Sequence, residues 1–174
     1  MTDSFARTWA FCAKTGEDVI PYLHDCIATE IRQDGSELSL FFPDGFWLLA
    51  RDPRNPYGDT LHRTGPSAAV VSMGYPEAEA DVENAICAEL FHQHCICRGL
   101  EFTTVTYPKV SALIEKVNKG RWSLEFKEKY PCYNRGYVVL CYFRTGKDFR
   151  QCYLNLDCRR ICFYWNEVLE DRVW

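Results

Sequence analysis

The pattern of apolar and polar positions in residues 26–50 predicts three neighbouring β-strands. The runs CIATEI, ELSLFF and FWLLA are separated by turn sequences that contain Asp34-Gly35 and Asp44-Gly45. Asp-Gly pairs between β-rich runs are typical of hairpins, because glycine adopts the positive φ that tight turns require. We therefore expect a three-stranded antiparallel meander in the N-terminal part of the chain.

Two later segments have the three- and four-residue spacing of apolar positions that is typical of amphipathic helices. The first is predicted from about Glu77 to Arg98, directly after Pro76. Its buried face would comprise Val82, Ile86, Leu90 and Phe91. The second is predicted between Pro108 and Gly120, because proline suits the first turn of a helix and glycine suits its end.

The C-terminal part is again rich in strand-like segments, and Trp122, Leu124 and Phe126 alternate with polar residues as in a half-buried strand. Tyr137–Phe143 and Phe149–Leu156 flank a polar turn and predict a hairpin, whereas residues 157–174 fit either a helix or a strand. Residues 51–66 contain three prolines and two glycines, which predicts a long surface loop. Together, these predicted strands and helices indicate an α+β fold in one globular domain over residues 1–174, with a mostly antiparallel sheet and two helices.

Composition bears on the compartment and on the cysteines. No run approaches the roughly 20 apolar residues of a membrane span, and the N-terminus lacks the basic and apolar regions of a secretory signal. We therefore expect a cytoplasmic protein without membrane contact, in the host cytoplasm if a phage encodes it. In that reducing compartment the ten cysteines are expected to be thiols, used as small buried hydrophobic residues.

Charge is distributed unevenly along the chain. Residues 1–97 carry 15 Asp and Glu against 6 Lys and Arg, whereas residues 98–174 carry 9 against 14. Within the first predicted helix, five acidic residues occur without a single Lys or Arg before Arg98. An acidic helix can occupy a basic groove on a partner. The residues predicted to bind the partner are Glu77, Glu79, Asp81, Glu83 and Glu89, with Trp47 and Tyr57 as aromatic anchors.

The basic C-terminal half offers an alternative, direct binding of nucleic acid. Aromatic residues alternate there with basic ones, and bases can stack on rings while Lys and Arg contact phosphates. The candidate residues are Lys127, Lys129, Arg135, Arg144, Lys147, Arg150, Arg159 and Arg160. The sequence pI of about 5.6 argues against this alternative.

A second alternative is a cytosolic cysteine or zinc enzyme centred on residues 92–97. Imidazole and thiolate are good zinc ligands, and the weak candidates are His92, His94, Cys95 and Cys97. On a helix the pairs His92/Cys95 and His94/Cys97 would point about 160° apart, so one zinc ion could not bind all four. We therefore expect no metal or other cofactor, with zinc as the exception to test.

Known catalytic sequence motifs are absent from the chain. It has no phosphate-binding glycine loop, no nucleophile elbow and no H-E-x-x-H helix, and nothing positive supports an enzyme. The sequence hypothesis is a non-catalytic inhibitor that binds a nucleic-acid-processing enzyme. Its size, acidity and lack of motifs are those of small phage and mobile-element proteins that block host defence, such as anti-CRISPR proteins.

Overall fold

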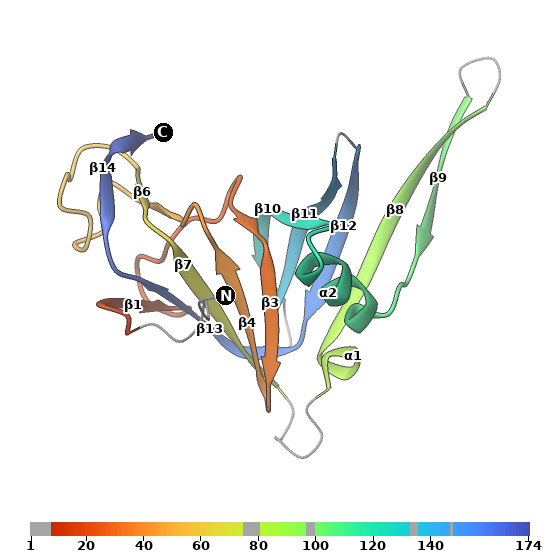
Figure 1. Ribbon diagram of the computed structural model, residues 1–174, viewed down its shortest axis with the longest axis horizontal. Coiled ribbons are helices and arrows are strands. Elements are labelled where there is room, and N and C mark those ends of the chain that lie inside the picture. Colours follow the sequence, from red (N-terminus) through yellow and green to blue (C-terminus); the bar gives the residue numbers. More distant parts are fainter. Residues whose placement is uncertain (1–7, 75–80, 97–99, 133–135, 147) are drawn as a thin grey trace.

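The computed structural model describes residues 8–74, 81–96, 100–132, 136–146 and 148–174, the side chains of 95, 96 and 100–102 excepted (Figure 1). The described residues form three antiparallel sheets. The first has the order β1 (Phe11–Lys14), β13 (Cys158–Trp165), β7 (Ser67–Met73), β4 (Glu37–Phe42) and β3 (Glu30–Asp34). The second has the order β2 (Ile27–Ala28), β10 (Ser123–Pro131), β11 (Tyr137–Thr145), β12 (Asp148–Leu156), β8 (Ile86–Ile96) and β9 (Leu100–Thr106). The third comprises β14 (Val168–Val173), β6 (His62–Thr64) and β5 (Trp47–Leu48).

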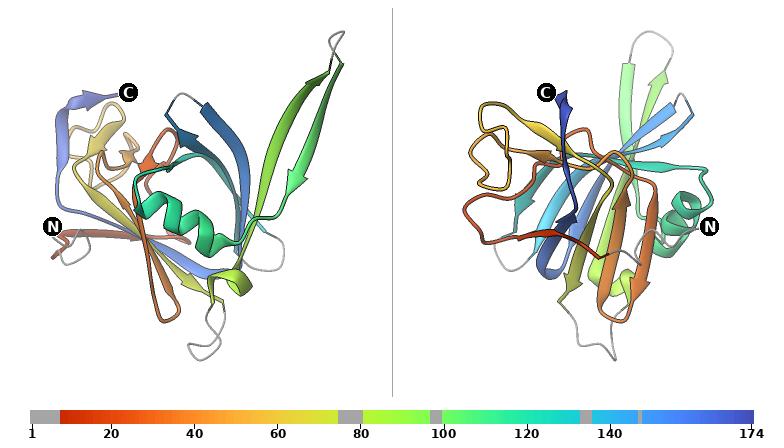
Figure 2. Two further views of the ribbon diagram at one scale, coloured as in Figure 1. Left: turned by 45° about the vertical axis from the view of Figure 1, so that its right-hand side comes forward. Right: turned by 60° about the vertical axis from the view of Figure 1, so that its left-hand side comes forward.

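The two large sheets diverge from one another, and the core fills the space between them (Figures 1 and 2). Helix α2 (Val110–Asn118) lies across this space and contacts β3 of one sheet and β8 of the other. Phe42, Phe46 and Phe163 are completely buried, and their rings form edge-to-face pairs 5.0 and 5.7 Å apart. Such edge-to-face pairs add to the stability that burial of each ring supplies.

The α+β prediction is wrong, because the described chain is mostly antiparallel β-structure with two short helices. Within the predicted helix from Glu77 to Arg98, Val82–Ala85 form the short helix α1 and Ile86–Ile96 form strand β8, while residues 77–80, 97 and 98 lie outside the described ranges. A spacing of four residues is even, so it also places side chains on one face of a strand. Ile86, Ala88 and Leu90 are buried in this way, with Cys87 exposed between them.

The predicted N-terminal meander is also wrong in its third strand. β3 and β4 form the expected hairpin, but β5 pairs with β6 in the third sheet, and β7 occupies the second edge of β4. Gly45 makes this change of sheet possible. It has a φ of +75°, and a Cβ at this position would lie 2.2 Å from the backbone oxygen of Thr64. A close approach of this kind admits only glycine.

Other elements match the sequence prediction. The hairpin of β11 and β12 is confirmed, and the second predicted helix is α2, whose Val110, Leu113 and Val117 are buried. The loop of residues 51–66 ends earlier than predicted, because His62–Thr64 pair with β5 and β14. No helix among the described residues has the length and apolar character needed to cross a membrane.

Candidate functional site

The second sheet extends into a projecting two-stranded ribbon. β12 pairs with β8 only from Ile86 to Leu90, whereas β9 pairs with β8 from Leu90 to Ile96. Beyond Leu90, therefore, β8 and β9 continue without the rest of the sheet and leave the body of the molecule (Figures 1 and 2). We call the paired segments 90–96 and 100–106 the β8–β9 ribbon.

The outer strand of this ribbon is an open sheet edge. Thr103, Thr104, Val105 and Thr106 are all exposed, and no charged residue occurs between Phe102 and Tyr107. β-Branched residues favour strand pairing, and an uncharged edge offers unpaired backbone groups to a further strand.

The edges of the first sheet are covered. Asn118 of α2 binds the backbone of Ile31 in β3 with both side-chain atoms, accepting from its N–H at 2.8 Å and donating to its oxygen at 2.7 Å. In β1, the backbone oxygen of Cys12 accepts a hydrogen bond of 2.9 Å from Arg54. Side chains thus take the place of a neighbouring strand at both edges.

The remaining edges are short or charged. β2 and β5 have two residues each, and Trp47 of β5 exchanges backbone hydrogen bonds with Tyr22. β14 carries exposed Glu170, Asp171 and Arg172. Short length, charge and covering segments are the devices by which proteins protect sheet edges. Within the described part of the chain, the segment Thr103–Thr106 of β9 is an exposed outer edge without charged residues, and the only charged residue of β9 is Glu101 at its start.

A cleft of about 770 Å³ lies between the ribbon and the β11–β12 hairpin. The residues lining it include Phe91, His92 and His94 from β8, and Tyr142, Phe149 and Arg150 from the hairpin. Phe149 is 68% exposed and lies edge-to-face against Tyr142 at 5.3 Å. The cleft therefore offers apolar ring surface beside polar groups on the β8 side of the ribbon, where β8 separates from β12.

The two histidines occupy one face of the ribbon because they are two residues apart in a strand. Nε2 of His92 lies 2.9 Å from the hydroxyl of Thr106, and Nε2 of His94 lies 2.9 Å from that of Thr104. The side chain of Cys95 and the whole of Cys97 lie outside the described residues. No group of three or more His, Cys, Asp or Glu side chains suited to a metal ion is present within the described ranges.

The predicted acidic surface is largely engaged in the protein's own structure. Glu77 and Glu79 lie outside the described residues, while Asp81 caps α1 by accepting from the N–H of Glu83 at 3.1 Å. Glu89 accepts a hydrogen bond of 3.0 Å from Asn155. Among the described acids, Glu83 lies in α1 and Glu89 in strand β8, so these two do not share one helix.

Glu83 caps the start of α2 from a distant part of the chain. Its carboxylate accepts from the N–H groups of Val110 and Ser111, both at 2.9 Å, and from the Ser111 hydroxyl at 2.6 Å. The N-cap residue Lys109 has no side-chain hydrogen bond of its own. Desolvation by itself raises the pKa of Glu83, but the hydrogen bonds from Ser111 and Val110 outweigh it and hold the pKa below its usual value.

We expect Glu83→Gln to lower the free energy of unfolding by about 1 kcal/mol at pH 7, the usual value of a helix cap. Because the folded pKa is lowered, this contribution is present above the unfolded pKa of about 4.3 and is lost as pH falls through the folded pKa. Urea unfolding at pH 7 and at pH 3 measures the loss of stability in Glu83→Gln and its decrease at low pH. The control is Glu115→Gln. Glu115 is an exposed acid of α2 that forms an ion pair with Lys119, so its substitution should lower the free energy of unfolding less than Glu83→Gln does. Equal effects of the two substitutions would contradict the cap.

The candidate nucleic-acid residues do not form one open basic surface. Lys127 pairs with Asp25 and Glu125, and Arg144 pairs with Glu125 at 2.9 Å. Arg135 and Lys147 lie outside the described residues. Lys129 lies over the ring of Tyr137, and Arg150 lines the cleft. Arg159 donates a hydrogen bond to the backbone oxygen of Gly74, and Arg160 is exposed on β13.

The two predicted aromatic anchors are packed within the structure. Trp47 is 9% exposed and is covered by Trp174, whose ring lies 5.1 Å away. The guanidinium of Arg63 lies 4.9 Å from the centre of the Trp47 ring. Tyr57 is half-buried against the buried His62 at 4.5 Å.

Several of the described thiols are buried in apolar surroundings that oppose their ionisation. Eight cysteines fall in the described side chains; none is in a disulfide, and five of them are buried. Burial raises the pKa of Cys26 to about 12 and raises the pKa of Cys87 and Cys141 as well. A reactive cysteine needs the opposite shift. The cysteine-enzyme alternative gains no support from these residues.

The open edge of β9 and the cleft beside it were missed by sequence reasoning. A signal was present in the uncharged run Phe102–Tyr107, but an edge is defined only when all strand pairings are known.

Comparison of the chain with protein-family models, with curated proteins and with solved structures finds no match.

Proposed function

We propose that this is a non-catalytic binding protein that recognises an extended segment of another protein by strand addition along β9. The unprotected edge of the projecting ribbon carries this proposal. A strand added to such an edge gains backbone hydrogen bonds, and pockets beside the edge supply specificity. The cleft lined by Phe91, Tyr142 and Phe149 lies on the β8 side of the ribbon, so the proposal rests on backbone pairing at β9 and not on this cleft.

Another protein fits this edge better than nucleic acid does. Backbone pairing requires a polypeptide, and the edge residues Thr103–Thr106 carry no positive charge for phosphates. Lys127 and Arg144 are neutralised by acidic neighbours. Inhibition of a nucleic-acid-processing enzyme, in the manner of an anti-CRISPR protein, is the narrower form of the proposal. It rests on the small size, the acidity and the lack of catalytic motifs.

The test is affinity capture from nuclease-treated lysate of the organism that encodes the protein. Val105 is 39% exposed on the β9 edge, and we expect Val105→Lys to reduce the amount of the captured partner at least tenfold. A lysine on an edge strand disfavours pairing without disturbing the core. The matched control is Val173→Lys, because Val173 is 48% exposed on β14, another edge strand.

Each outcome decides the proposal. A partner that wild type and Val173→Lys retain and Val105→Lys loses supports strand addition. A partner that all three retain, or no partner in any of them, overturns it. Light scattering measures the oligomeric state of the wild type and of Val105→Lys. If the wild type is a dimer and Val105→Lys is a monomer, a second copy of the chain occupies the β9 edge, and this result also contradicts the proposal.

A further inference from the structure

A β-bulge turns one lysine toward the interior between the two large sheets. The register of β10 against β11 passes from Phe126 opposite Cys141 to Glu128 opposite Leu140, so Lys127 is the additional residue. Lys129 then lies opposite the buried Val139, on the core side of the sheet. A bulge re-aims the side chains that follow it.

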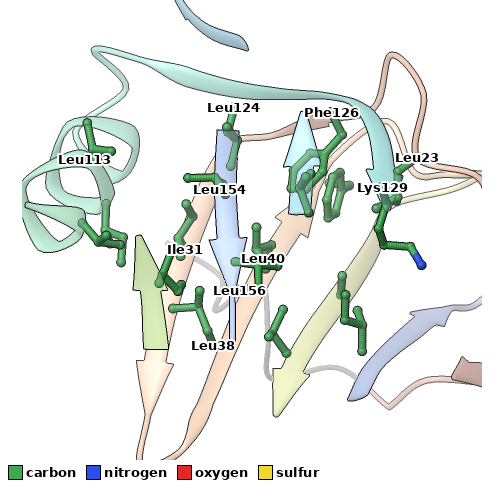
Figure 3. A pocket seen from close by; sticks show the side chains of 18 of the residues that line it. Leu23, Ile31, Leu38, Leu40, Leu113, Leu124, Phe126, Lys129, Leu154 and Leu156 are labelled. Atoms are coloured by element: carbon green, nitrogen blue, oxygen red, sulfur yellow. The ribbon is translucent and has the colours of Figure 1, made fainter. Parts of the chain in front are cut away.

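Lys129 is at the junction of two cavities. The inner cavity, of about 50 Å³, lies between the sheets, and every lining residue other than Lys129 is apolar. The outer cavity, of about 210 Å³, is lined by three basic residues, Arg51, Lys127 and Lys129, by two acidic ones, Asp18 and Glu128, and by Tyr22 and apolar side chains. Leu23, Phe126 and Lys129 line both. In Figure 3, Lys129 and Leu23 lie at one end of the inner cavity and Leu113 of α2 lies at the other.

The ammonium group of Lys129 forms no ion pair with an acidic side chain of the described residues. Its contact is the ring of Tyr137, 4.1 Å from Nζ. The neighbouring Glu128 is turned to other groups, since it accepts from the Tyr22 hydroxyl and lies 3.7 Å from Nδ1 of His24. Burial lowers the pKa of Lys129. A partly buried cation without a carboxylate costs free energy, which a bound anion would offset.

We propose that the joined cavities form a binding site for a short-chain aliphatic carboxylate. The carboxylate pairs with Nζ of Lys129, and the alkyl chain enters the apolar cavity between the sheets. The site takes a small ligand, because the inner cavity is smaller than the roughly 150 Å³ that holds benzene in an engineered protein core. This inference does not depend on strand addition at β9, which lies at the far edge of the second sheet from β10.

The probes are butanoate and 1-butanol, titrated into the ¹⁵N-labelled full chain and followed by amide chemical shifts. We expect butanoate to shift the amides of Leu23, Phe126 and Lys129. We expect Lys129→Met to weaken butanoate binding at least tenfold and to leave butanol binding unchanged. Methionine replaces most of the aliphatic stem of Lys129, so the variant is expected to fold. Lys116→Met is the matched control, because Lys116 also contacts an aromatic ring, that of Trp122 at 4.3 Å.

Three results would overturn the proposal. The first is the absence of saturable butanoate binding to the wild type up to roughly 20 mM, a concentration well above the millimolar Kd of a weak specific site. The second is equal butanoate affinity of wild type and Lys129→Met. The third is an equal loss in Lys116→Met, which would indicate general charge attraction in place of a site.

Discussion

Arg54→Met is expected to lower the free energy of unfolding by about 3–5 kcal/mol, the cost of breaking a buried ion pair from one side. The Asp52 side chain is completely buried, and Arg54 binds both of its carboxylate oxygens, Nε to Oδ1 at 2.8 Å and Nη2 to Oδ2 at 3.0 Å. Without the guanidinium, that carboxylate has no cation to balance its charge. The same arginine also donates to the backbone oxygens of Cys12 and Val19, so its loss loosens β1 as well.

Urea unfolding at pH 7 measures this effect. The control is the double variant Arg54→Met with Asp52→Asn, which also removes the unpaired buried charge of residue 52. The side-chain oxygen of the asparagine can still accept a hydrogen bond from the backbone N–H of residue 54. We expect the double variant to be more stable than Arg54→Met alone. A loss below about 1 kcal/mol in Arg54→Met would place this pair with ordinary surface salt bridges and contradict its role.

Trp47→Ala is the second large effect, with an expected loss of about 3–5 kcal/mol from the cavity that it leaves. The ring is 9% exposed and packs against Trp174. Its Nε1 is buried and has no hydrogen-bond partner among the described residues. Trp47→Phe removes that unpaired N–H and keeps a ring, so we expect it to cost less than about 1.5 kcal/mol.

Trp47 can thereby be assigned to the core or to an interface. Stability lost in Trp47→Ala and largely kept in Trp47→Phe supports the core role. If Trp47→Ala unfolds at the wild-type urea concentration and fails to capture the partner, Trp47 is an interface anchor as the sequence suggested, and its packing against Trp174 has no bearing on stability.

Local pattern predicted the elements in which one structure alone fits the periodicity. β11, β12 and α2 belong to this group, because two β-rich runs that flank a polar turn indicate a hairpin and the 110, 113 and 117 spacing indicates a helix. The segment after Val82 admits two, since Ile86 and Leu90 share a face in a helix and in a strand. Pairing with β12 and β9 decides for the strand, and no local signal contains that information.

The candidate sites follow the same division. His92 and His94 were recognised as neighbours in sequence, but a strand, and not a helix, places them together on one face. Glu83, which the sequence predicts to bind a partner, also caps α2, a contact that no local pattern indicates because residues 83 and 110 meet only in the folded chain. The β9 edge and the position of Lys129 depend on strand order and on a bulge, which long-range pairing determines.

The measurement that tests strand addition most directly is amide hydrogen exchange of the protein alone and in complex with its captured partner. Strand addition predicts slower exchange at Thr103–Thr106 in the complex, because the outward N–H groups of β9 become hydrogen-bonded. Exchange elsewhere in the second sheet, at β10 and β11, is expected to stay the same. Unchanged exchange at β9 with slower exchange at another surface would contradict the proposed binding edge.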